Sequence, residues 1–282
     1  MRFNLDTAEI FIPDGLPVEQ ALRRTTHMTI AAHQDDIEIM SAQPILACFQ
    51  QEEAWFTGVV MTDGRGSPRD DLYKNYTDED MRLVRFKEQK KAAVIGEYAA
   101  QVLLDYPSKA VKDGKNQKPV EDIVALLKAT HPQYVYTHNL ADKHDTHVGT
   151  ALKVIAAIRS LPVAERPEKL FGFEVWRDLD WMVDSDKVPF DLTSHENLQA
   201  ALLGVFDSQI CGGKRYDLAT MGRRRANATY FESHGVDLTL GMSYAMDLTP
   251  LITDPPKDVA QYLQEFIQRF GQDVTARLQR LS

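Results

Sequence analysis

The stretch from Thr29 to Met40, TIAAHQDDIEIM, constrains the fold more than any other part of this 282-residue chain. It begins as a short run of β-branched and small apolar residues, which is typical of a buried strand. The run breaks off into polar residues, and apolar residues return at helical spacing from Ile37 to Phe49. The order strand, polar loop, helix is that of an open α/β sheet, whose sites lie at the carboxyl ends of the strands.

The polar loop in this stretch holds one His and several carboxylates. On a tight turn, the adjacent Asp35 and Asp36 cannot both face one point, so one can bind a metal beside His33 while the other faces what the metal holds. A catalytic zinc site needs three protein ligands and an open position. The loop therefore supplies two ligands and a candidate base. We expect Glu38 either to orient His33 from behind or to cap the helix.

A second polar loop is the candidate source of the third ligand. THNLADKHDTHVGT, residues 137–150, follows the apolar run Tyr134 to Tyr136, which predicts another buried strand. If the helix that follows this loop has already begun at His144, then His144 and His147 lie on one face of it, because they are three residues apart. One can bind metal while the other meets the substrate. Asp142, in the same loop, is a candidate partner behind the ligands.

With these residues in view, the sequence resembles the PIG-L/LmbE-like zinc-dependent N-deacetylases over about residues 26–158. AHQDDIE matches the family's AHPDDxE stretch except at Gln34, and HDTH matches the looser form of its HxxH stretch. Three further stretches resemble the family's intervening landmarks in order: MTDGRG at 61–66, RFKEQKKAAVIGE at 85–97 and LLDYP at 103–107. The resemblance implies a zinc-dependent deacetylase that acts on N-acetylglucosaminyl compounds.

Residue by residue, the resemblance implies one zinc per chain, held by His33, Asp36 and His147. It makes Asp35 the general base that takes a proton from the metal-activated water. It makes His144 the group that stabilises the tetrahedral intermediate or protonates the leaving amine. The ligand set of two imidazoles and one carboxylate also accepts iron, cobalt or manganese.

The chain departs from the family pattern at two places. Gln34 stands where the family has Pro, and Thr146 stands where the stricter HxDH motif has Asp, with Asp145 one place earlier. That Asp normally tunes the neighbouring His, so the departure bears on the pKa and role of His144. Asp145 is either a local replacement or a substrate contact.

Other polar residues at the same predicted edge are candidate substrate contacts. Asp63 and Arg65 lie in the Gly-rich loop MTDGRGSPRD, which lacks the spacing of a phosphate or dinucleotide motif. Asp105 precedes a residue held extended by Pro107, and such a stiff loop can present it to a hydroxyl. For each, a plain turn or helix cap is the alternative.

Aromatic and charged residues supply three further expectations. Trp176 and Trp181, with the Asp residues around them, form either a sugar-binding rim or ordinary core and solvated loop. Pairs like Arg85 and Glu88, three residues apart on a helix, are usually surface ion pairs. The basic run at residues 223–225 is either a solvated element or an anion contact.

Strand and helix patterns alternate regularly along the chain, which predicts an α/β, Rossmann-like, doubly wound and mostly parallel sheet with a C-terminal α+β extension. We expect an N-terminal arm at 1–25, a metal-binding catalytic core at 26–176, and an extension at 177–282 that completes the pocket. We expect one helix from Ser194 to Ile210, with Ser194 as its N-cap. The amphipathic helix at 258–270 must bury its apolar face on the core or against a partner. If that face is exposed, a homo-oligomer is the explanation.

Composition excludes several classes of protein. A formal net charge of −9 and the absence of a Lys/Arg-rich tract argue against a nucleic-acid backbone as partner. No apolar run approaches the roughly 18 residues that span a membrane, and no signal peptide is visible. Only Cys48 and Cys211 are present, both in apolar settings, which predicts buried thiols and no thiolate zinc site. The default expectation is a cytoplasmic protein.

The sequence therefore predicts a metal-dependent hydrolase that removes an acetyl or other acyl group from the nitrogen of a small amino-sugar substrate. One alternative is a metal-dependent phosphoesterase, which needs further ligands for a second ion. Another is a sugar-binding descendant that has lost turnover, which would bind zinc and ligand without forming product.

Overall fold

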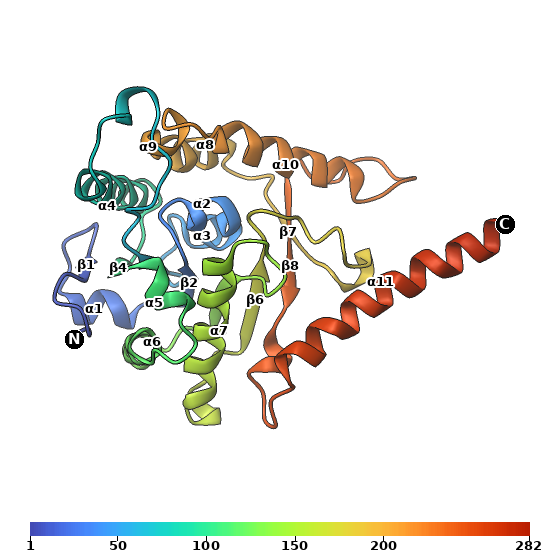
Figure 1. The fold of residues 1–282 in the computed structure, drawn as a ribbon, viewed down its shortest axis with the longest axis horizontal. Helices are drawn as coiled ribbons and strands as arrows, with labels where there is room; N and C mark the ends of the chain where they lie inside the picture. The colour runs from blue at the N-terminus through green and yellow to red at the C-terminus, as the bar shows by residue number, and fades with distance from the viewer.

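The computed structural model describes all 282 residues and contains one eight-stranded sheet flanked by helices (Figure 1). The order of strands across the sheet is β1-β4-β3-β2-β5-β6-β8-β7. The strands are β1 Glu9–Phe11, β2 His27–Ala31, β3 Phe56–Thr62, β4 Ala100–Tyr106, β5 Tyr134–His138, β6 Lys169–Phe173, β7 Val188–Asp191 and β8 Met242–Asp247.

The five central strands, from β4 to β6, pair in parallel, and antiparallel strands lie at both ends of the sheet. β1 pairs with β4 at one edge, while β8 pairs with β6 and β7 pairs with β8 at the other. The prediction of a doubly wound, mostly parallel sheet is confirmed. Since β7 and β8 continue the same sheet, the C-terminal part of the chain extends the central layer.

Eleven α-helices connect and cover the strands (Figure 1). They are α1 Val18–Arg23, α2 Asp36–Met40, α3 Ala42–Cys48, α4 Asp78–Ile95, α5 Ser108–Lys112, α6 Lys118–Thr130, α7 Asp145–Ser160, α8 Glu196–Gly204, α9 Asp207–Ile210, α10 Tyr216–Tyr230 and α11 Val259–Leu281. One face of the sheet packs against α5, α6, α7 and the start of α11, and the other packs against α2, α3, α4 and α8.

The core is divided by the sheet because side chains alternate along each strand. In β3, Val59 and Met61 join the cluster under α5 to α7, while Phe56 and Val60 join the cluster under α2 to α4. The central strands are buried on both faces, as parallel strands between helices require. Their carboxyl ends therefore open at one common edge, where the polar loops follow.

Three expectations about elements need correction. The helix expected at 194–210 is broken into α8 and α9, and His195, rather than Ser194, occupies the N-cap position of α8. The last helix runs far beyond residue 270, to Leu281. Only Tyr262 and Phe266 on α11 are buried, so the expectation that its apolar face packs on the core is met only in part.

None of the helices combines the length and the apolar character needed to cross a bilayer. Cys48 is buried as expected, and Cys211 is only partly buried.

Candidate metal centre

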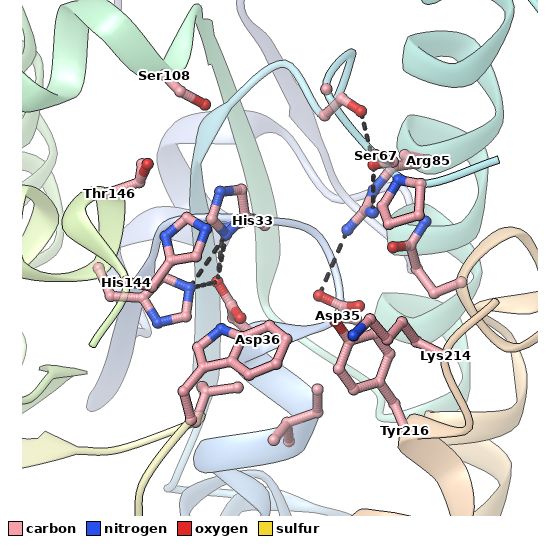
Figure 2. Close-up of a pocket in the computed structure, with 18 of the residues that line it drawn as sticks. His33, Asp35, Asp36, Ser67, Arg85, Ser108, His144, Thr146, Lys214 and Tyr216 are labelled. Carbon is pink, nitrogen blue, oxygen red and sulfur yellow. Dashed lines mark hydrogen bonds and ion pairs between the residues drawn. The ribbon is translucent and has the colours of Figure 1, made fainter. Parts of the chain in front are cut away.

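The loop after β2 is built by one unusual backbone conformation. Asp35 has φ +90°, in a region that side chains rarely adopt, and it occupies the N-cap position of α2. This turn separates the two neighbouring carboxylates, because Asp36 faces back toward His33 while Asp35 faces away (Figure 2). The main-chain N–H of His33 donates to Oδ2 of Asp36 at 2.7 Å, which closes the loop. Strained backbone of this kind is common at functional sites.

Three ligand-type atoms from two loops converge on one point. Nδ1 of His33 lies 3.1 Å from Oδ2 of Asp36 and 3.2 Å from Nε2 of His147. Nε2 of His147 lies 3.3 Å from the same Asp36 oxygen. The structure thus brings together the three residues that the sequence suggested as ligands.

The three atoms have the spacing that a tetrahedral metal site requires. Zinc binds nitrogen and oxygen at about 2.0–2.2 Å, so two ligand atoms of a tetrahedral site lie about 3.3–3.4 Å apart. Distances of 3.1 to 3.3 Å leave room for one divalent cation with a fourth position toward the pocket. The donor set of two imidazoles and a carboxylate suits zinc and other transition metals.

His147 is oriented by a carboxylate on its far side. Its Nδ1 lies 3.0 Å from Oδ2 of Asp142, which leaves Nε2 directed at the convergence point. The main-chain N–H of Val175 donates to the same Asp142 oxygen, so the carboxylate is itself fixed. A carboxylate behind a ligating His is a standard arrangement at metal sites. Asp142 therefore lies where the sequence analysis placed it, behind a ligand.

His138 lies beside the three atoms but is not available through Nε2. Its Nε2 accepts a hydrogen bond of 2.8 Å from the main-chain N–H of Ala32, which occupies the lone pair. The ring is fully buried and stacks on His147 with centroids 3.9 Å apart. Burial lowers the pKa of His138 to about 4, so the ring is neutral. His147 therefore packs against an uncharged ring on this side.

The carboxylates and imidazoles of the centre shift one another's pKa. Burial acts to raise the pKa of Asp36, but the imidazole of His147 holds it well below its usual range. Burial acts to lower the pKa of His147, but the carboxylates of Asp36 and Asp142 raise it. The two carboxylates therefore favour a positive charge between them, whether a proton or a metal ion.

Asp35 points toward the opposite side of the pocket, where it meets Arg85 (Figure 2). One oxygen of Asp35 lies 3.4 Å from Nη2 of Arg85, and burial raises the pKa of Asp35 to about 7 against the opposing effect of that guanidinium. Oε1 of Gln89 accepts a hydrogen bond of 3.2 Å from the main-chain N–H of Asp35. A carboxylate placed this way can accept a proton from a group held in the pocket.

Gln34 is the reason that Arg85 reaches Asp35. Nε of Arg85 donates to the side-chain oxygen of Gln34 at 3.1 Å, and Nη2 donates to the Gln34 carbonyl. Nη1 donates to Ser67 at 2.6 Å, and Gln34 donates to the carbonyl of Thr62. The expectation that Arg85 pairs at the surface is therefore wrong.

Glu88, its expected partner, is also buried and instead accepts two hydrogen bonds from Ser208, at 2.8 and 2.6 Å. Each of the two residues thus ties α4 to a different part of the chain, Arg85 to the metal loop and Glu88 to α9.

His144 lies on the near side of the centre without a carboxylate behind it. Its ring centroid is 4.6 Å from that of His147 and 5.0 Å from that of His33. Its Nδ1 is buried without a hydrogen-bond partner, and burial together with the two neighbouring imidazoles lowers its pKa. Asp145 is exposed on the first turn of α7. Asp145 thus does not replace the Asp that the motif lacks.

The structure does not bring Asp63, Arg65 or Asp105 into the pocket lining. Asp105 is buried and receives two hydrogen bonds of 2.7 Å from Arg82, a partner that the sequence gave no reason to expect. Arg65 pairs with Asp63 at 2.9 Å and with Glu79 at 2.6 Å. These residues form an ion-pair network beside the pocket, and Asp145 lies outside the lining as well.

Glu38 plays neither of the two expected parts. Its carboxyl accepts hydrogen bonds from Gln89 and from the hydroxyl of Tyr98, both at 2.8 Å, and does not contact His33. Burial raises its pKa to about 8. Because Gln89 also holds the main chain of Asp35, Glu38 supports the metal loop from beneath.

The centre opens into a pocket of about 380 Å³ (Figure 2). That volume suits a small molecule. Besides His33, Asp35, Asp36, His144 and His147, its lining includes Ser67, Arg85, Ser108, Lys112, Thr146, Trp176, Gln209, Lys214 and Tyr216. Trp176 presents a ring with Nζ of Lys214 at 5.4 Å and Nζ of Lys143 at 5.8 Å from its centroid. Trp181 instead donates to Glu174, outside the pocket lining.

Several site residues escaped sequence reasoning. Arg85 was assigned to the surface, and Lys214 and Tyr216 come from a weakly patterned stretch after α9. The signal for His138 was present, because it lies at the start of the polar loop after the predicted strand at Tyr134 to Tyr136, and the structure makes it the last residue of β5. The basic run 223–225 was also misjudged, since Arg224 is buried and donates to the carbonyl of Glu38.

The comparison with protein families matches the loops that build this centre. Residues 28–158 match the model described as PIG-L: GlcNAc-PI de-N-acetylase. Residues 28–158 form a PIG-L domain. The PIG-L domain spans β2 to α7 and thus contains both metal loops. No curated protein matches the sequence.

Solved structures share the fold around the PIG-L domain. A conserved protein from Thermus thermophilus is 20% identical, covers 78% of this chain and 93% of its own, and has a TM-score of 0.60. N,N'-diacetylchitobiose deacetylase from Pyrococcus horikoshii is 18% identical, and the match covers 78% of this chain and 83% of the deacetylase, with a TM-score of 0.58. The 4-carboxy-2-hydroxymuconate hydratase from Pseudomonas putida is 14% identical, and the match covers 79% of this chain and 95% of the hydratase, with a TM-score of 0.58. Since a deacetylase and a hydratase share this fold, the reaction must be argued from the site.

Proposed function

We propose that this protein is a metal-dependent N-deacetylase, with one zinc ion per chain, that acts on a small N-acylated amino sugar. The observation that carries the proposal is the convergence of His33, Asp36 and His147 within 3.3 Å beside the free carboxylate of Asp35. The description of the matched family, GlcNAc-PI de-N-acetylase, and the likeness to a diacetylchitobiose deacetylase support the choice of substrate class.

The residues divide the reaction between the two sides of the pocket. A divalent metal held by His33, Asp36 and His147 would supply a Lewis acid for an amide carbonyl and would favour ionisation of water. Asp35 accepts the proton of the attacking water as the new C–O bond forms. His144, across the centre, donates a hydrogen bond to the developing oxyanion. The proton that Asp35 accepted passes to the leaving nitrogen as the C–N bond breaks. The products are a carboxylate and a free amine.

Trp176 and its lysine neighbours indicate the kind of sugar. An indole ring offers a flat apolar surface to the face of a sugar ring. The ring of Trp176 lies 6.4 Å from that of His144 and has two ammonium groups within 6 Å of its centre. The lining also holds Lys112 and Arg85, so cations outnumber the two carboxylates. We infer that the sugar carries an anionic substituent, because carboxylate or phosphate would be attracted to this wall of the pocket.

A phosphoesterase with two metals is less well supported. Two groups of side chains could hold an ion, one comprising His33, His144 and His147 and the other Asp36, His138 and His147. Both groups contain His147, so they describe one centre. A single centre fits hydrolysis of an amide better than a clamp on a phosphoryl group, which uses two ions about 3.5–4 Å apart.

Release of free amine tests the proposal directly. Purified protein with zinc is incubated with N-acetylglucosamine and with a phosphorylated and a carboxylated derivative, and amine is quantified. We expect amine release, fastest from the anionic substrates. The Asp35→Asn variant should lose about 10²–10⁴-fold in rate, because the proton acceptor is removed while the ligands remain. Asp145→Asn, a change in an exposed carboxylate near the second loop, is the matched control and should keep full activity.

Two results would contradict the proposal. Equal rates for the Asp35→Asn variant and the unmodified protein would remove Asp35 as the base. Absence of amine from all N-acetylated substrates, with water added to an unsaturated acid instead, would assign the protein to the hydratases that share this fold.

A further inference from the structure

The distal half of α11 has no cover in a single chain. Figure 1 shows the helix leaving the body and projecting outward to the C-terminus. Its last ion pair with the body joins Arg269 to Asp186 at 2.7 Å, and residues 271–282 are all exposed. A helical segment this short is marginal in water without tertiary contacts. Contacts from outside this chain would stabilise it.

The exposed segment carries an apolar stripe. Ile267, Val274, Leu278 and Leu281 are 39%, 40%, 65% and 76% exposed, and Phe270 between them is half-buried. These residues lie within about 80° of arc at 100° per residue. The buried residues of the helix, Tyr262 and Phe266, lie about 100° away from the centre of this arc. The centre of the stripe thus lies to one side of the helix face that packs on the body.

The spacing of the stripe is symmetric about Val274. Phe270 and Leu278 lie four residues on either side of it, and Ile267 and Leu281 lie seven residues on either side. Reversing the helix direction about Val274 therefore superimposes the stripe on itself. An isologous interface across a two-fold axis requires this self-complementarity.

We propose that α11 is a dimerisation helix, which pairs antiparallel with α11 of a second copy of this chain across a two-fold axis at Val274. In this register Val274 meets its own counterpart, Phe270 packs on Leu278 of the second copy, and Ile267 packs on Leu281 of the second copy. The inference does not depend on the proposed activity.

Charges along the stripe agree with this register. Asp273 and Arg277 lie on one flank and already pair within the helix at 3.0 Å. In the antiparallel pair, Arg277 of each copy comes within about two residues, or 3 Å along the axis, of Asp273 of the other. Two symmetric ion pairs would then border the apolar seam. They favour the reversed orientation, because opposite charges meet.

The same charges argue for a protein partner. The helix carries Arg269, Arg277 and Arg280 against Glu265 and Asp273, and contains no Lys. Helices that lie on a membrane surface are rich in Lys and Arg on their polar face. The polar face of α11 is instead mostly Gln, Thr and mixed charge. A second copy, with the same mixed charges, is the complementary occupant.

A further apolar segment can enlarge the interface. A stable dimer buries about 800 Å² per partner, which is more than one helical stripe provides. The last residue of α10, Tyr230, is exposed, and the segment after the helix exposes Val236, Leu238 and Leu240. Figure 1 shows this segment projecting from the body on the same side as the end of α11. A partner seated on α11 would therefore approach it.

The mass of the full-length protein in solution tests the proposal. Light scattering or sedimentation at tens of micromolar should give twice the chain mass of 31.9 kDa. Val274→Glu and Leu278→Glu should each halve the mass, because a charge enters the seam. Gln272→Glu, on the opposite face of the exposed helix, is the matched control and should leave the dimer intact. A monomeric unmodified protein, or a dimer unaffected by both seam substitutions, would overturn the proposal.

Cross-linking tests the register separately. In a Val274→Cys variant the two introduced thiols meet at the two-fold axis, so mild oxidation should join the two chains. The Gln272→Cys variant should stay uncross-linked under the same conditions. Dimers in which the first variant fails to cross-link, or both variants cross-link equally, would overturn the antiparallel register.

Discussion

At the scale of single residues, the site depends on packing that sequence motifs do not show. Gly64 has φ +72°, and a Cβ there would lie 2.6 Å from Oε1 of Gln34 and 2.9 Å from Cδ of Arg85. The space beside Gly64 is thus filled by the two side chains that hold Asp35. Gln34, which departs from the family's Pro, is part of this contact.

We expect Gly64→Ala to destabilise the protein by about 1–3 kcal/mol, because the methyl group is strained by the backbone and displaces Gln34 or Arg85. Denaturant unfolding of apo protein measures the effect. Gly66→Ala is the matched control, since no atom lies within 4 Å of a Cβ at that position and its φ is ordinary. Equal stability of the two variants would show that the contact at Gly64 does not constrain the loop.

The role of a residue could be predicted only where it depends on residues close to it in the sequence. The grouping of His33, Asp36 and His147 followed from two short motifs, each after a predicted strand. Asp105 could not be assigned, because its partner Arg82 lies on another element and claims both carboxylate oxygens. Chemistry that depends on such distant partners is invisible in the motif itself.

At the scale of elements, β2 begins with a half-buried histidine away from the candidate metal centre. The ring of His27 packs 4.9 Å from that of Tyr134 and 6.1 Å from that of Tyr136, and Nδ1 lies 2.9 Å from the Thr26 hydroxyl. Burial lowers its pKa to about 4. The folded strand therefore favours the neutral ring.

This burial predicts a loss of stability on acidification. Between pH 6.5 and about 4, the unfolded chain binds a proton at His27 that the folded chain does not. The contribution of the neutral ring to the free energy of unfolding is thus fully present above pH 6.5, and it is lost as the pH falls toward 4. His27→Gln should flatten the fall in melting temperature across this window, measured with a chelator so that metal release does not contribute. The exposed His234→Gln should keep the original slope, and equal slopes in all three proteins would contradict the prediction.

Helix boundaries show where the sequence signal ends. Strands β2 to β6 were predicted because buried parallel strands are short apolar runs. The end of α11 was not, because the helix continues past Gly271 through residues that touch nothing else in the chain. The single helix expected at 194–210 was wrong for a different reason, since the break between α8 and α9 lets Ser208 reach Glu88.

At the scale of the whole molecule, topology makes the site. β2 and β5 are parallel neighbours, so their carboxyl ends deliver the two metal loops to one point. The sheet then brings the turn after β6, with Trp176, and the segment between α9 and α10, with Lys214, to the same pocket. The alternation of elements predicted the first of these relations. The second depends on how 177–282 folds back, which no local pattern specifies.

Metal content per chain tests the central claim most directly. Elemental analysis of protein saturated with zinc and then freed of excess should give one ion per chain for the unmodified protein and for Asp35→Asn. His147→Ala should retain little or none, because two ligands rarely hold a catalytic ion. Two ions per chain, or an unchanged content in the His147→Ala variant, would contradict a single centre built from His33, Asp36 and His147.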